Sequence, residues 1–193
     1  MTATSAAYDL ASWNTFAAAE VGAAAALTGL LFVAVSINLE RILSFPKLPA
    51  RAGETLVTLV LVLVAATLTL IPQSTRLLGL EVAILAGVTA ATTLTVQIRH
   101  GPDSPADPAY WYVSRIASVQ TVTLSFLLGG CSLAAHWGGG LYWFAVATVL
   151  GFLGAVYNAW VLLVEIVRPH RVGTSAGSVP LPSAGTDPPH QLP

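Results

Sequence analysis

Two acidic residues lie inside apolar runs at the same distance from where each run begins. Glu20 follows Phe16 by four residues, and Glu81 follows Leu77 by four residues. If both runs are helices that enter a membrane from the same side, each carboxylate lies about 6 Å below that surface. If the two carboxylates meet at one depth, charge repulsion and burial favour the protonated form of one of them. Such a pair could bind and release protons near neutral pH.

The same two carboxylates also fit a simpler role. Each is shallow enough to reach the interface, and Glu81 can complement the dipole of its helix from the first turn. The sequence therefore leaves open a proton-binding outer pair and two independent interfacial residues.

A second polar group is expected toward the opposite side of the membrane. Amides on three different runs can join helices by hydrogen bonds of about 0.6 to 2 kcal/mol each, so structural bridging explains them without a pathway. The group comprises Gln97, Gln120 and Asn158, with Arg115 and Glu165 nearer the boundary. On the same side, ion pairing at the headgroup level is expected for Glu40, Arg41, Arg51 and Glu54. Exposed pairs of this kind contribute little to stability.

The fourth apolar run carries small and hydroxyl residues on one helix face. They are Ser114, Ser118, Thr121, Ser125, Gly129 and Ser132, and similar faces are formed by Gly22, Ala26 and Gly29 and by Ala147, Gly151, Gly154 and Asn158. Small residues let helix backbones approach closely in lipid, so we expect packing. A water-filled path would use the same residue types, and that alternative stays open.

Sequence motifs for catalysis or for cofactor binding are not found. The chain has no Gly-rich phosphate loop, no HExxH, no GxSxG and no CxxC, and Cys131 is its single cysteine. The four histidines are scattered, and His136 is expected to be an interfacial residue. We therefore predict no metal site and no cofactor, and leave enzymatic activity uncertain.

The elements that must position these residues are transmembrane helices. Hydrophobic residues make up 55% of the 193 residues and charged residues 9%, against about 25% charge in a soluble domain. Each apolar run has about the 20 residues needed to cross a bilayer. The sequence predicts an all-α polytopic membrane protein, a bundle of five transmembrane helices at about 16–37, 52–71, 77–98, 113–135 and 141–166. A net charge of −1 gives no basic excess for nucleic acid.

The basic residues predict the orientation of this bundle. Arg76 is expected on one side, and the other seven, Arg41, Lys47, Arg51, Arg99, Arg115, Arg168 and Arg171, on the opposite side. The positive-inside rule then places the short segment 1–12 outside, and the C-terminus in the cytoplasm. The transmembrane domain is 13–171, and the Pro/Gly/Ser-rich segment 172–193 is predicted to be a disordered cytoplasmic tail.

The stretch GLLFVAVSINLERIL, from Gly29 to Leu43, is followed by a proline loop and an Arg-Ala-Gly-Glu helix start. It resembles small uncharacterised integral membrane proteins of high-GC bacteria, some of which carry the label of modulator of the FtsH protease. The resemblance covers the first two runs and assigns no functional residue. It implies a multi-pass protein of the bacterial cytoplasmic membrane.

Two functions follow from these features. The first is a non-enzymatic protein that regulates, chaperones or scaffolds another membrane protein, in contact with lipid and with that partner or with copies of itself. The second is a small proton- or cation-conducting channel or transporter that uses Glu20 and Glu81. Because five spans cannot divide into two equal inverted halves, the second function would need an oligomer.

Overall fold

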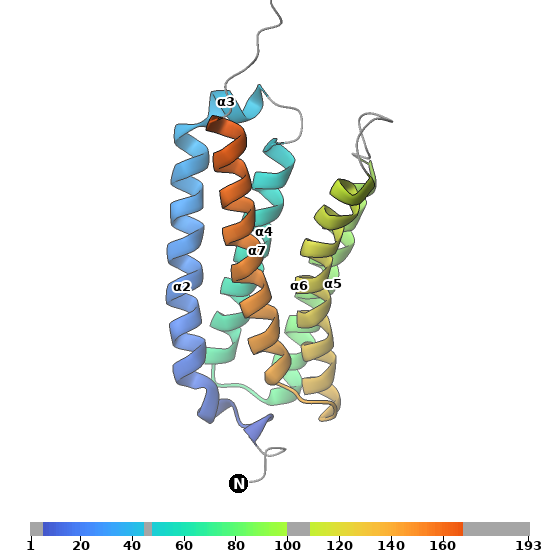
Figure 1. Cartoon of the computed structure of the whole chain (residues 1–193). Helices are drawn as coiled ribbons and strands as arrows, with labels where there is room; N and C mark the ends of the chain where they lie inside the picture. Colours follow the sequence, from blue (N-terminus) through green and yellow to red (C-terminus); the bar gives the residue numbers. More distant parts are fainter. Residues whose placement is uncertain (1–5, 45–47, 100–108, 168–193) are drawn as a thin grey trace, which may run out of the picture.

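The computed structural model describes residues 6–44, 48–99 and 109–167, and long helices dominate these residues. They are α2 (Leu10–Ile37), α3 (Leu39–Leu43), α4 (Leu48–Leu70), α5 (Thr75–Arg99), α6 (Ala109–Ala135) and α7 (Tyr142–Val167). All but the short α3 have stretches long and apolar enough to cross a membrane. The prediction of an all-α bundle with five such helices is confirmed (Figure 1).

The first long helix begins earlier than its apolar run. Asp9 is its N-cap, and the Asp9 side chain accepts a hydrogen bond of 3.2 Å from the backbone N–H of Ala11. This cap satisfies a backbone donor that the helix itself leaves unpaired, so the helix starts at Leu10 rather than at Phe16. The predicted segment 172–193 and the loop 101–108 lie outside the described residues.

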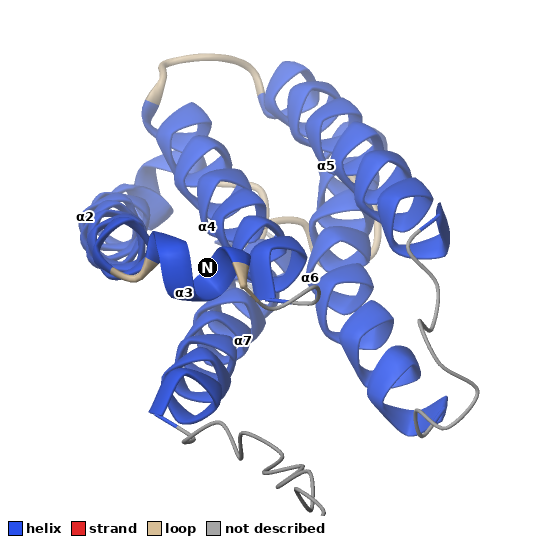
Figure 2. Cartoon of the chain, turned by 90° about the horizontal axis from the view of Figure 1, so that it is seen from above, coloured by secondary structure: helices blue, strands red, loops and turns tan. Residues whose placement is uncertain are grey.

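The helices form two groups that lie side by side (Figure 2). Helices α5 and α6 pack against each other as an antiparallel hairpin, while α4 packs against both α2 and α7. Helix α7 also packs against α6, so it connects the two groups. We call the end that carries residues 6–9 the N-terminal end of the bundle, and the other the α3 end (Figure 1).

Two apolar clusters form the core. The larger cluster draws buried residues from all five long helices: Ala24, Leu61, Val62, Ala65, Leu78, Val82, Ala86, Val122, Phe126, Leu133, Leu141, Phe144 and Ala147. The smaller cluster lies toward the α3 end and comprises Leu31, Ile42, Leu48, Ala52, Leu59 and Ala155. Its members come from α2, α3, α4 and α7, and none of the described side chains of α5 or α6 belongs to it.

Helices α5 and α6 approach most closely at a pair of glycines. A Cβ on Gly79 would lie 2.5 Å from the backbone nitrogen of Ala134, and a Cβ on Gly130 would lie 2.6 Å from that of Ala83. Real Cβ atoms do not approach backbone this closely, so each position accepts glycine alone without a shift of the helices. Gly130 therefore sets the distance between α5 and α6. It was not part of the predicted small-residue face of α6, which includes its neighbour Gly129.

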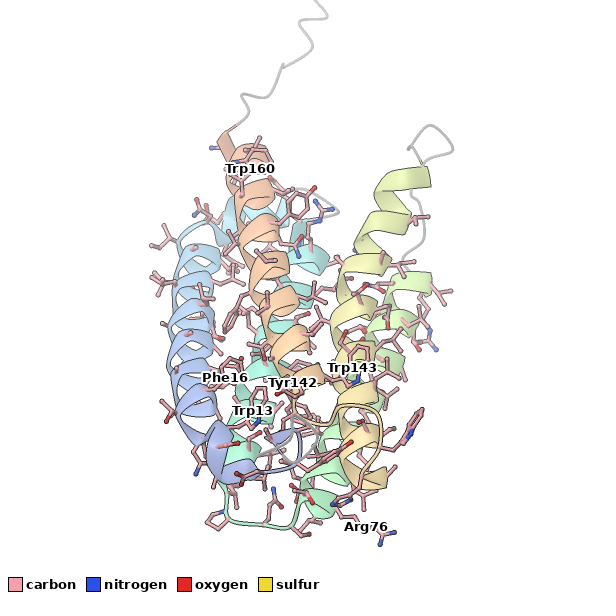
Figure 3. All side chains as sticks on the ribbon, turned by 60° about the horizontal axis from the view of Figure 1, so that its bottom comes forward. Trp13, Phe16, Arg76, Tyr142, Trp143 and Trp160 are labelled. Carbon is pink, nitrogen blue, oxygen red and sulfur yellow. The ribbon has the colours of Figure 1, made fainter. Side chains whose placement is uncertain are left out.

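Residues 6–9 close one end of the bundle. The backbone oxygen of Ala7 accepts a hydrogen bond of 2.9 Å from the N–H of Leu141, and the Tyr8 hydroxyl accepts one of 3.3 Å from Gly139. Trp13 donates from its indole N–H to the oxygen of Ala6 at 2.9 Å. The bonds of Ala7 and Tyr8 fix these residues against the connection between α6 and α7. Close by, the Trp13 ring meets the rings of Phe16 and Tyr142 edge to face (Figure 3).

Candidate functional site

Glu20 is buried between α2 and α7. The residue is 7% exposed, and its Oε2 accepts a hydrogen bond of 3.1 Å from the hydroxyl of Thr148, which is itself buried. A charged carboxylate is costly in lipid unless it is paired, and Thr148 offers one neutral donor. The bond thus connects two helices, and Glu20 is more buried than Glu81, the other acidic residue predicted to lie with it.

Glu81 has a different partner. Its Oε2 accepts a hydrogen bond of 3.0 Å from the side-chain amide of Gln73, which also donates to the backbone oxygen of Leu68 at 3.2 Å. Gln73 lies in the turn between α4 and α5, so this contact fixes the turn at the N-terminal end. Glu20 and Glu81 therefore have separate hydrogen-bond partners, Thr148 on α7 and Gln73 in the turn between α4 and α5. Nothing in the sequence except the position of Gln73 next to Pro72 indicated that Gln73 would bind Glu81.

Two of the amides expected on the opposite side meet between α5 and α6. The side-chain nitrogen of Gln120 donates to the oxygen of Gln97 at 3.4 Å and to the hydroxyl of Thr93 at 3.2 Å. Gln97 is fully buried. Asn158 is buried on α7, while the side chain of Glu165 lies outside the described residues. The contacts of Gln97 and Gln120 join the two helices of the hairpin.

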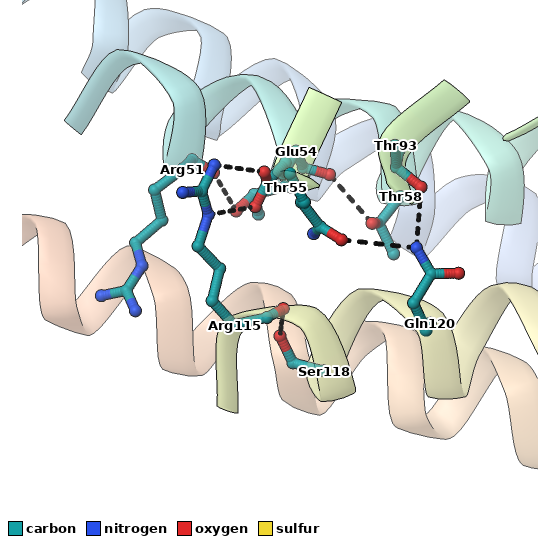
Figure 4. A network of polar contacts seen from close by, with 9 residues as sticks. Arg51, Glu54, Thr55, Thr58, Thr93, Arg115, Ser118 and Gln120 are labelled. Carbon is teal, nitrogen blue, oxygen red and sulfur yellow. Dashed lines mark hydrogen bonds and ion pairs between the residues drawn. The ribbon is translucent and has the colours of Figure 1, made fainter. Parts of the chain in front are cut away.

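Arg115 forms a buried ion pair with Glu54, from α6 to α4 (Figure 4). Its Nε donates to Oε2 of Glu54 at 2.9 Å, and its Nη2 donates to Oε1. The side chains of Arg115 and Glu54 are 15% and 7% exposed. Glu54 thus forms an ion pair, as expected, but the pair is more buried than the surface-like pair expected, because α6 covers Glu54 and supplies a partner 61 residues away.

The residues of the predicted face on α6 have several environments. The hydroxyls of Ser118 and Ser125 donate to backbone oxygens of α6 itself, and Thr121 is exposed. A Cβ on Gly129 would lie 3.0 Å from Phe144 and from Trp143 of α7. The remaining two members are Ser132, which accepts a hydrogen bond of 2.8 Å from Gly140, and Ser114, whose side chain lies outside the described residues.

An apolar layer separates the buried polar groups near the two ends. Ala24 follows Glu20 by about one helical turn, and Val62 follows Thr58 by about one turn on α4. Ala24 and Val62 are fully buried, and both belong to the larger core cluster. On either side of this layer, Glu20, Gln120 and Arg115 bond to side chains of neighbouring helices, which is an arrangement suited to holding helices together.

The length and composition of its helices define this chain as a polytopic helical membrane protein. Comparison of the chain with protein-family models, with curated proteins and with solved structures finds no match. Within the described residues, no three His, Cys, Asp or Glu side chains come together as potential metal ligands.

Proposed function

We propose that this chain is a non-enzymatic membrane protein that regulates, chaperones or scaffolds another membrane protein. The observation that supports this function is how its polar side chains within the spans are used. Glu20 bonds to Thr148, Arg115 to Glu54, and Gln120 to Gln97, each across two helices. These contacts use the polar groups to assemble the bundle instead of gathering them around a substrate.

The same proposal includes a location and an orientation. Arg41, Arg99 and Arg115 lie toward the α3 end. Arg76 lies in the first turn of α5, at the N-terminal end (Figure 3). An excess of arginine on one side favours that side as cytoplasmic. We therefore propose that the α3 end is cytoplasmic and that residues 6–9 are outside. The resemblance to proteins labelled modulators of the FtsH protease suggests that the membrane is a bacterial cytoplasmic membrane.

A partner helix would meet the outward-facing surfaces of α2 and α7. Phe32 and Ile37 of α2 and Leu153 of α7 are 63%, 78% and 63% exposed. Lipid covers such faces in an isolated chain, and a second transmembrane segment can replace lipid by packing against them. Another protein and a further copy of this chain are both compatible with these surfaces.

A channel or transporter is the second candidate, and the burial of Glu20 against Thr148 is the observation that favours it. Intramembrane acidic groups mark many ion and proton pathways. A path through one chain would have to cross the apolar layer at Ala24 and Val62. The channel candidate therefore requires several copies, with the path between them.

Photo-crosslinking in native membranes tests the helper function. A photoreactive residue replaces Phe32, which is exposed, or Val82, which is fully buried and is the matched control. We expect the label at position 32 to capture a different membrane protein, identified by mass spectrometry, and the label at position 82 to capture none. Products that contain copies of this chain and nothing else would contradict the helper function and favour the oligomeric channel.

A further inference from the structure

Helices α5 and α6 are joined along their length. Gly79 and Gly130 bring their backbones together near the N-terminal end. Toward the α3 end, Gln120 of α6 bonds to Gln97 and Thr93 of α5. A pair of helices held at both ends in this way moves as one body.

The hairpin is also packed firmly against the other helices at the N-terminal end. The rings of Phe126 on α6 and Phe144 on α7 meet edge to face, with centroids 5.8 Å apart. Gly129 leaves room for Phe144 and Trp143. The connection from α6 to α7 is in turn bonded to residue Ala7. Apolar packing and backbone hydrogen bonds thus hold this end.

The attachment at the α3 end is of a different kind. Among the described side chains, the smaller apolar cluster at this level contains none from α5 or α6, and Figure 1 shows both helices diverging from α7 toward this end. Buried polar side chains lie at this level, with Thr55 and Thr58 on α4 and Thr93 on α5 (Figure 4). Arg115 reaches across to Glu54 at this level.

We propose that the α5–α6 hairpin pivots about the N-terminal end of the bundle, and that the Arg115–Glu54 ion pair is the latch that holds its α3 end against α4. A buried ion pair contributes little net stability compared with apolar packing, yet it selects one arrangement strongly, which suits a contact that must open and close. The step is a rigid-body rotation of two packed helices. Opening would expose the polar faces of α4 and α5 to water at the α3 end. This inference goes beyond the proposed function and does not require a partner.

Distances between spin labels in the full chain, held in lipid nanodiscs, test the latch. The background carries Cys131→Ser. One pair of labels at Val57 on α4 and Val113 on α6 reports the α3 end, and a second pair at Leu70 and Ala135 reports the N-terminal end. All four positions are exposed, so labels disturb the packing little.

In Glu54→Gln we expect the distance at the α3 end to lengthen by about 5 Å and to broaden, the scale of known helix rearrangements. The distance at the N-terminal end stays unchanged. The charge exchange Glu54→Arg with Arg115→Glu restores the short distance. Glu40→Gln, which removes an exposed carboxylate near the same end, matches the wild type.

An unchanged label distance at the α3 end in Glu54→Gln would show that the ion pair is not a latch. Equal changes of the label distances at both ends would show that the hairpin does not pivot. If Glu54→Gln does not fold, Arg115→Gln is measured in its place. Failure of both variants to fold would also overturn the proposal, since the pair would then be a requirement of the fold rather than a latch.

Discussion

Gly130→Ala is expected to destabilise the bundle by about 3 kcal/mol, a large overpacking effect. The new Cβ would lie 2.6 Å from the backbone nitrogen of Ala83 and 2.7 Å from the backbone oxygen of Gly79. Neither atom belongs to a flexible side chain, so α5 and α6 must move apart along their interface. Denaturant or thermal unfolding of the purified protein in detergent measures the loss.

Gly22→Ala is the matched control for this substitution. Gly22 is also a glycine within a transmembrane helix, but a Cβ there would meet nothing within 4 Å. We expect the stability of Gly22→Ala to remain within about 1 kcal/mol of the wild type, the range of glycine and alanine helix propensities. Equal losses in both variants would show that the Gly79 and Gly130 contact does not control the hairpin.

Arg115→Ala is expected to cost about 3 kcal/mol, because it leaves the carboxylate of Glu54 buried without its cation. Glu54 is 6% exposed, and both of its oxygens accept hydrogen bonds from Arg115. The same unfolding measurement applies, with Arg41→Ala as a control, since Arg41 is an exposed arginine near the same end.

A double variant separates the loss of the pair from the cost of an orphaned charge. Replacing both partners, as Glu54→Leu with Arg115→Met, removes the buried charges together, and such replacements are often neutral or stabilising. We expect the double variant to be more stable than Arg115→Ala. If Arg115→Ala lowers the free energy of unfolding no more than Arg41→Ala does, water reaches Glu54. The ion pair would then contribute as little as a solvent-exposed pair.

The five spans could be predicted from the sequence because lipid imposes a simple length and polarity rule on each helix separately. Their bounds differ from the predicted ones mainly where capping extends a helix, as Asp9 does for α2. The pattern of small residues included Gly129, which packs against α7, but not Gly130, which makes the closest contact with α5. Gly129 and Gly130 are adjacent, and the partner helix α5 decides which of them meets a backbone.

The polar contacts were less predictable, because they depend on which helices become neighbours. The meeting of Gln97 and Gln120 follows from two consecutive antiparallel helices. The pairing of Arg115 with Glu54 requires α6 to pack against α4 near the α3 end, which no local pattern specifies. Glu20 and Glu81 each lie four residues into their predicted spans, but a position along a helix does not determine which side of the helix the residue occupies.

The central claim is that the polar groups within the spans hold the helices together and do not carry ions. The direct measurement is proton and cation flux into liposomes that contain the purified protein, under a pH gradient and across a range of membrane potentials. We predict no flux above that of empty liposomes, and none for Glu20→Gln, which retains an acceptor for Thr148. A flux in the wild type that Glu20→Gln abolishes while the protein remains folded would contradict the claim and establish the channel function.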